Sequence, residues 1–158
     1  MSLIRTGIVA MALACVAVPA LAAAQGGYDT DPTRDQFVAQ ADPKCKRANA
    51  RSNREFKPVE KLVRKGKYKA AGEALIRGEE YQLKLYKKLG NLDRPPADAK
   101  TIGKWLRGLK AGSETWIDAG RQLKKKRFKA ASAGLDEAGE LFKKARKKVR
   151  GFGFRYCA

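Results

Sequence analysis

Apolar residues recur along most of the chain at alternating steps of three and four, which is the spacing of one face of an α-helix. The last such stripe consists of Phe128, Ala131, Leu135, Ala138, Phe142, Ala145, Val149 and Phe152. An earlier stripe consists of Ile102, Leu106, Leu109, Trp116 and Leu123, completed by the small residues Ser113 and Gly120. Helix-forming residues dominate residues 34–149 and β-branched residues are few, so we expect an all-α fold.

Glycine and proline divide this helical region into segments. Gly90 is expected to end one helix, and the Pro-Pro pair at 95–96 is expected to open the next. Gly66 marks a second break. Pro43 and Pro58 interrupt the first helical region, so we expect a kink or a restart at each.

The chain resembles itself when it is shifted by 60 positions. Residues 62–71 (LVRKGKYKAA) then overlay residues 122–131 (QLKKKRFKAA), which predicts a second turn near residues 124–127. We interpret the repeat as two helical hairpins, each with a basic turn followed by an aromatic residue and two alanines. Chance similarity between helices rich in Ala and Lys is the alternative.

Two hairpins joined by a short loop predict an up-down-up-down four-helix bundle, whose two chain ends lie at the same pole. Cys45 and Cys157 lie near the two ends of the folded region and would then be neighbours. Once Cys15 leaves with a signal peptide, these two cysteines remain, and an even count in an exported chain favours a bridge. We therefore expect one Cys45–Cys157 disulfide to close the bundle.

Residues 1–24 have the three-part layout of a secretory signal peptide. Arg5 precedes an apolar run that is short for a permanent membrane span, and cleavage is expected after Ala22 or Ala24. Lipidation of Cys15 is the alternative, although Ala12 stands where such signals usually have Leu. The predicted organisation is a signal peptide (1–24), a mobile arm (25–33) and a helical-bundle domain (34–158), secreted or held in the cell envelope without a permanent membrane span.

Several kinds of chemistry are missing from the sequence. The chain has no histidine, so the usual general base at neutral pH and all imidazole metal ligands are absent. Both methionines, Met1 and Met11, leave with the signal peptide, which argues against haem ligation. Glu79 with Glu80 is the kind of acidic pair that on a lysine-rich helix is usually solvated. We expect no enzyme activity and no catalytic, cofactor-binding or metal site.

Four segments together resemble small, uncharacterised exported helical proteins of actinobacterial type. They are residues 37–49 (FVAQADPKCKRAN), residues 95–98 (PPAD), the Trp-Leu pair at 105–106 and residues 151–157 (GFGFRYC). The resemblance implies a helical bundle and a cysteine pair, and it implies no activity. Pro43 stands where those proteins more often have a helix former, which argues against a straight first helix. Apart from the resemblance, Asp42 is expected to cap a helix before Pro43.

Charge is the one feature that points to a partner. The mature chain (25–158) has 34 Lys and Arg against 16 Asp and Glu, a net charge of +18 once Arg5 is removed. An up-down-up-down chain places its two basic turns side by side, so we expect a basic pole opposite the disulfide. Its residues are Lys61, Arg64, Lys65, Lys67, Lys69, Arg121, Lys124, Lys125, Lys126, Arg127 and Lys129.

The predicted function is that of a non-enzymatic basic helical module that binds anionic envelope polymers, lipid headgroups or extracellular nucleic acid. One alternative is that the charge only keeps the protein soluble. A second is a protein–protein interaction module or homodimer, with an apolar docking face at Tyr81, Leu83 and Tyr86 that lies partly off the main stripe of its helix.

Overall fold

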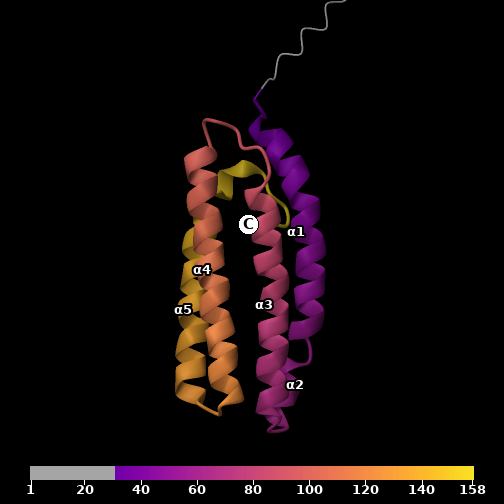
Figure 1. Cartoon of the computed structure of the whole chain (residues 1–158), viewed down its shortest axis with the longest axis vertical. Helices are drawn as coiled ribbons and strands as arrows, with labels where there is room; N and C mark the ends of the chain where they lie inside the picture. Colours follow the sequence, from indigo (N-terminus) through magenta and orange to yellow (C-terminus); the bar gives the residue numbers. More distant parts are fainter. Residues whose placement is uncertain (1–30) are drawn as a thin grey trace, which may run out of the picture.

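The structure, a computed structural model, describes residues 31–158. Its elements in chain order are α1 (Arg34–Phe56), α2 (Val59–Arg64), α3 (Tyr68–Gly90), α4 (Ala99–Lys124), α5 (Phe128–Lys147) and the 3-10 helix η1 (Arg150–Phe152). Four long helices run alternately up and down (Figure 1), so the predicted bundle of two hairpins is confirmed. The predicted signal peptide and residues 25–30 of the predicted arm lie outside the described residues.

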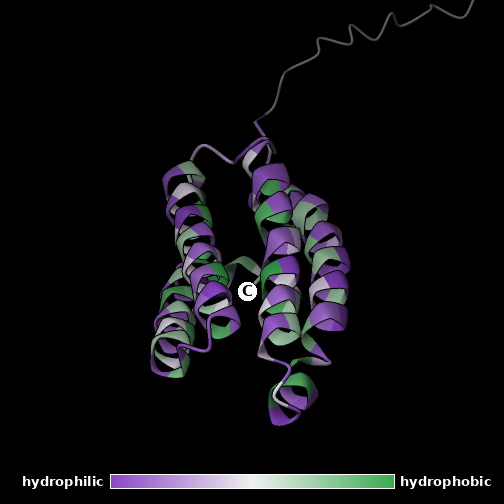
Figure 2. Cartoon of the chain, turned by 60° about the horizontal axis from the view of Figure 1, so that its bottom comes forward, coloured by the Kyte–Doolittle hydropathy of each residue, from purple (hydrophilic) through white to green (hydrophobic). Residues whose placement is uncertain are grey.

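The long helices pack in the order α1, α3, α4, α5. Helix α3 packs against both α1 and α4, and α4 packs against α5, whereas α1 and α5 make no extended contact. Apolar and polar residues alternate along each helix (Figure 2), as the stripes predicted. The bundle is therefore closed on three sides and open between its first and last helices. None of the helices between residues 31 and 158 is long and apolar enough to cross a membrane.

Helix α1 corrects one expectation about its proline, the helix cap at Asp42. It begins at a capping box, in which Thr33 Oγ1 accepts the backbone N–H of Gln36 and the Gln36 side chain accepts that of Thr33. The helix then continues through Pro43 without a restart, although it does restart after Pro58 as predicted. Asp42 caps no helix. A proline removes one backbone donor, and the remaining hydrogen bonds and the buried Phe37, Ala41 and Cys45 suffice to keep α1 continuous.

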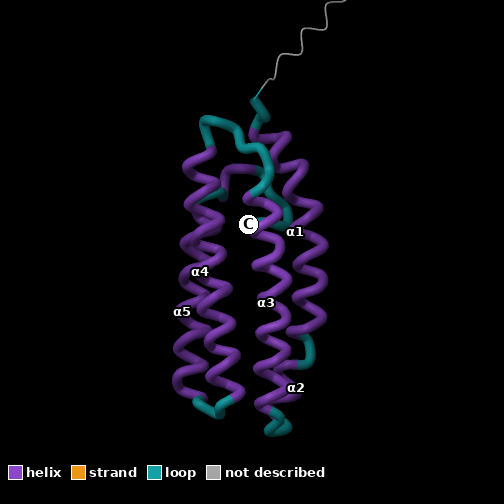
Figure 3. The backbone as a smooth tube through the Cα atoms, in the orientation of Figure 1, coloured by secondary structure: helices purple, strands orange, loops and turns teal. Residues whose placement is uncertain are grey.

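The turn before α3 and the turn before α5, which lie at the lower end of the bundle in Figure 1, have the same backbone conformation. Gly66 has φ +68° and Lys126 has φ +58°, both in the left-handed region. The amide of Lys67 donates to the carbonyl of Leu62, and that of Arg127 donates to the carbonyl of Gln122, at 2.9 and 3.0 Å. Both turns lie at the same end of the bundle (Figure 3). The internal repeat therefore corresponds to a repeated helix–turn–helix structure.

At the upper end of the bundle, α4 begins later than expected, because the Pro-Pro pair at 95–96 lies in the loop and does not open the helix. Helix α3 ends at Gly90 as predicted, but α4 begins at Ala99, after a turn that follows the Pro-Pro pair. Asp98 occupies the cap position and forms a two-point ion pair with Arg34, with both N–O distances 2.8 Å. This pair ties the start of α1 to the start of α4.

The core has two parts. The larger part surrounds the disulfide, and its biggest fully buried side chains are Trp105, Phe37, Leu89, Ile102 and Val149. The smaller part lies near the lower turns and consists of Ala71, Leu75, Leu123 and Ala131. Trp116 packs against both. Phe128 was expected in the core stripe but is 48% exposed, because it stands at the very start of α5, where the helix leaves the turn.

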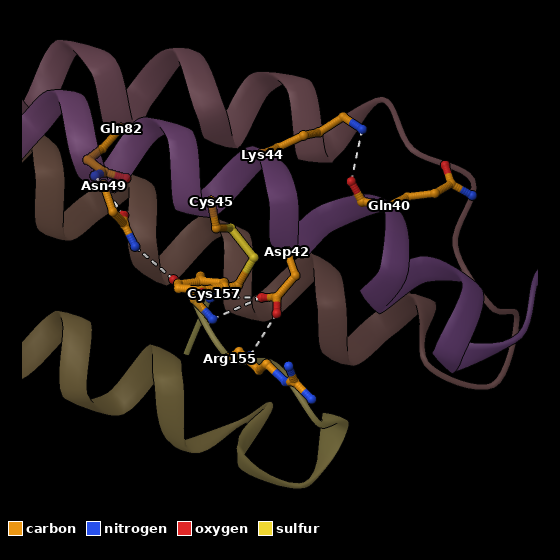
Figure 4. The surroundings of a disulfide bond; sticks show 9 residues. Gln40, Asp42, Lys44, Cys45, Asn49, Gln82, Arg155 and Cys157 are labelled. Atoms are coloured by element: carbon orange, nitrogen blue, oxygen red, sulfur yellow. Dashed lines mark hydrogen bonds between the residues drawn. A yellow bond between two sulfur atoms is a disulfide. The ribbon is translucent and has the colours of Figure 1, made fainter.

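The Cys45–Cys157 disulfide is present, with its Cα atoms 5.3 Å apart, as predicted. Asp42 supports it (Figure 4), because its carboxylate accepts the backbone amides of Arg155, Tyr156 and Cys157 at 2.8, 3.0 and 3.2 Å. Asn49 Nδ2 also donates to the carbonyl of Tyr156 at 2.8 Å. The segment after η1 is thereby held against α1, at the upper end of the open side of the bundle.

Candidate functional site

The structure brings together the two turns that carry the predicted basic pole. Tyr68 opens α3 and Phe128 opens α5, and their rings meet edge to face with centroids 4.6 Å apart. A hollow of about 470 Å³ lies beside this contact, and basic residues from both turns line it. Those residues are Lys67, Lys69, Lys124 and Lys126. The aromatic residue after each basic turn thus joins the turns into one surface.

Three of the eleven basic residues at this pole are paired with carboxylates. These pairs are Arg64 with Glu60, Arg121 with Asp118, and Lys124 with Glu73. The other eight side chains are exposed and have no carboxylate within 4.0 Å among residues 31–158. They are Lys61, Lys65, Lys67, Lys69, Lys125, Lys126, Arg127 and Lys129. The pole therefore retains a concentrated positive charge.

A second candidate site, which the sequence did not reveal, is a cleft of about 620 Å³. It lies on the open side of the bundle, because α1 and α5 do not pack against each other. Its polar lining comes mainly from α1 and α3 and consists of Asn49, Ser52, Asn53, Glu79 and Gln82, with Arg146 and Arg155 from the far side. Its aromatic lining consists of Phe56, Tyr86, Trp105, Trp116, Phe142 and Tyr156.

Glu79 is the most unusual residue of the cleft, because its carboxylate is buried at mid-height of the bundle with only 4% exposure. The expectation that it is solvated is wrong. Ser113 Oγ donates a hydrogen bond to Glu79 Oε2. Burial raises the pKa of Glu79, and the Ser113 hydrogen bond and the charge of Arg146 oppose that rise. Burial, reinforced by the charge of Glu79, also raises the pKa of the Tyr86 hydroxyl above its ordinary range.

A signal for this burial was present in the spacing. Glu79 lies four residues after Leu75 and seven before Tyr86, on the inner stripe of α3. Ser113 likewise completes the predicted stripe of α4 and is 0% exposed. A carboxylate on a core stripe facing a hydroxyl on another core stripe therefore indicated a buried polar contact.

The polar wall of the cleft is held by its own hydrogen bonds. Gln82 Nε2 donates to Asn49 Oδ1 at 3.1 Å and to Ser52 Oγ at 2.9 Å. Ser52 Oγ in turn donates to the carbonyl of Gly78 at 2.7 Å. These bonds connect α1 to α3 and fix the side chains beside Glu79 before any ligand arrives.

The aromatic wall is also continuous. The Trp116 ring lies 5.9 Å from the Phe56 ring and 6.2 Å from the Phe142 ring, measured between centroids. Gly78 and Gly112 make room for Phe56 and Phe142, since a Cβ at either glycine would clash with the facing ring. The indole nitrogens of Trp105 and Trp116 are buried and have no hydrogen-bond partner among residues 31–158.

Of the three residues of the alternative docking face, Leu83 and Tyr86 line one hollow, of about 490 Å³, and Tyr81 lines another. All three side chains are half-buried, and Tyr86 packs against the larger core. Tyr81 lies 5.9 Å from the charged groups of both Arg51 and Lys84. Residues 31–158 also contain no group of three or more Cys, Asp or Glu side chains arranged to hold a metal ion.

Comparison of the chain with protein-family models, with curated proteins and with solved structures finds no match.

Proposed function

We propose that the protein is an exported, non-enzymatic module that binds an anionic polymer through the basic pole. The observation that carries this proposal is the Tyr68–Phe128 contact, whose ring centroids are 4.6 Å apart at the point where the two basic turns meet. Eight exposed basic side chains without carboxylate partners surround it in the described structure.

Concentrated like charge lowers the stability of the folded state through self-repulsion. A bound polyanion relieves that repulsion and releases its own condensed counterions, which favours binding at low salt. A polymer fits this surface better than a small anion does, because the eight charges are spread over two turns and the short helix α2. The Cys45–Cys157 disulfide is consistent with the oxidising compartment in which an exported protein works.

The test compares two sets of four charges at opposite ends of the bundle. One variant replaces Lys65, Lys67, Lys125 and Arg127 with Gln. The control replaces Lys87, Lys88, Lys147 and Lys148, which are exposed residues near the other pole, with Gln. Both variants lose the same net charge, so any difference between them reports position.

The probe is mixed-sequence double-stranded DNA, with polyphosphate as a second polyanion. Each neutralised phosphate contact contributes about 0.9 to the slope of log affinity against log salt. Removal of four contacts should therefore reduce the magnitude of this slope by up to about 3.6 in the pole variant. The control should lose clearly less. Equal loss in both variants would show that net charge alone drives binding, and that the basic pole is not the binding site.

A further inference from the structure

The buried carboxylate of Glu79 forms no ion pair with a side chain of residues 31–158, although the charge of Arg146, which also lines the cleft, acts on it from a greater distance. No Lys or Arg nitrogen among residues 31–158 lies within 4.0 Å of it, and the Ser113 hydroxyl is its one hydrogen-bonding side chain. Carboxylates with 4% exposure are rare unless they are paired, because an uncompensated buried charge is costly. The position of Glu79 in the wall of an open cleft therefore points to a cation that arrives from outside.

The surroundings of Glu79 suit an organic cation better than a metal ion. Calcium and magnesium require several oxygen ligands, whereas Glu79 is the one acidic side chain among the residues that line the cleft. Six aromatic side chains are among the residues that line the cleft, beside polar groups that include Arg146 and Arg155, and the faces of aromatic rings attract ammonium groups. Phe56, Trp116 and Phe142 form a continuous row on that wall.

We propose that the cleft binds a small organic ammonium ion, with its charged nitrogen against Glu79 and its apolar body against the row of rings. A volume of about 620 Å³ accommodates such a molecule. The amide side chains of Asn49 and Gln82, already fixed by hydrogen bonds, lie beside the charged end. This site is separate from the basic pole and does not depend on the polymer-binding proposal.

The two sites should respond oppositely to salt. The net charge of the chain repels a cationic ligand, and salt screens that long-range repulsion. The contact with Glu79 is buried, so salt weakens it much less. Ammonium binding should therefore stay constant or strengthen as salt rises, while polyanion binding falls.

Tryptophan fluorescence provides a direct readout. Trp105 and Trp116 are the two tryptophans of the whole chain, and both line the cleft. The protein is titrated with two matched pairs of probes, phenethylammonium against 2-phenylethanol and hexylammonium against 1-hexanol. Each pair keeps its carbon skeleton and exchanges the ammonium group for a neutral hydroxyl.

We expect saturable fluorescence changes in which at least one ammonium binds about 10-fold to 100-fold more tightly than its alcohol, the range for a hydrogen bond to a charged group. Glu79→Gln should abolish this preference, and Glu80→Gln, which alters the exposed neighbour, should keep it. The comparison of probes on the unaltered protein holds even if a variant folds poorly. Equal affinity within both pairs, no saturable change, or an unchanged preference in a folded Glu79→Gln protein would overturn the proposal.

Discussion

Lys126 occupies in the second hairpin turn the place that Gly66 occupies in the first, sixty residues earlier, and both residues adopt a left-handed backbone. The hydrogen bonds that close the two turns are equivalent. Glycine adopts this conformation without steric cost, whereas a side chain costs about 1–2 kcal/mol. The second turn therefore keeps a lysine at a position where the backbone favours glycine, which adds a charge to the basic pole at the expense of stability.

Lys126→Gly should raise the free energy of unfolding by about 1 kcal/mol. Lys125→Gly is the matched control, because it removes the same charge from a residue with φ −86° and should lower stability by about 0.5–1 kcal/mol. Denaturant unfolding of the two variants measures both effects. A loss of stability in Lys126→Gly would contradict the strain assigned to this turn.

Asp42 should contribute to stability through the C-terminal segment rather than through α1. Its carboxylate accepts three backbone amides that would otherwise lack a charged acceptor. Asp42→Ala should lower the free energy of unfolding by about 1–3 kcal/mol and increase amide hydrogen exchange at residues 155–157. Asp93→Ala, at an exposed loop position, should change neither. Unchanged exchange at residues 155–157 in the Asp42 variant would show that the disulfide alone holds the segment.

Glu79 should make stability depend on pH with a definite sign. Because burial raises its pKa, the folded protein still binds this proton at pH values where the unfolded chain, with a pKa near 4.5, has lost it. The free energy of unfolding should therefore fall as pH rises from that value through the folded pKa. Ser113, Tyr86 and Arg146 lie around this carboxyl, and the Ser113 hydrogen bond and, to a smaller extent, the charge of Arg146 limit the rise of its pKa.

Glu79→Gln should remove that part of the pH dependence and stabilise the protein at neutral pH by on the order of 1 kcal/mol. Asp98 acts in the opposite direction, since its hydrogen bond with Arg34 lowers its pKa and its contribution is lost as pH falls through the folded value. Denaturant unfolding of the wild type and of Glu79→Gln is measured over a series of pH values. The difference between the two free energies of unfolding gives the contribution of Glu79. A wild-type curve parallel to that of the variant at every pH would contradict the raised pKa.

Local signals were enough to predict much of this fold. The stripes, the break at Gly66 and the repeated turn depend on residues close in sequence, and the disulfide then follows from topology. The roles of Asp42 and Glu79 depend instead on partners 113–115 and 34 positions away. The stripe spacing indicates that Glu79 faces the core, but it does not identify Ser113 as its partner. Asp42 and Glu79 were accordingly interpreted as a helix cap and a solvated acid.

The cleft, too, could not be predicted from the spacing of residues within one helix. The cleft exists because α1 and α5 do not pack against each other. The apolar spacing within a helix does not specify which other helices it contacts. The basic pole was predictable because its charges adjoin the two turns in sequence. The order and direction of the helices suffice to predict a surface formed by turns. A cleft between helices can be predicted only when the packing of those helices is known.

The measurement that tests the central claim most directly is lysine footprinting with a bound polyanion. The protein is acetylated with and without polyphosphate at low salt, and mass spectrometry quantifies each lysine. Lys65, Lys67, Lys125 and Lys129, all exposed at the basic pole, should be protected, while the equally exposed Lys87, Lys88, Lys147 and Lys148 react as before. Uniform protection over both sets, or stronger protection of the second set, would contradict the assignment of polymer binding to the basic pole.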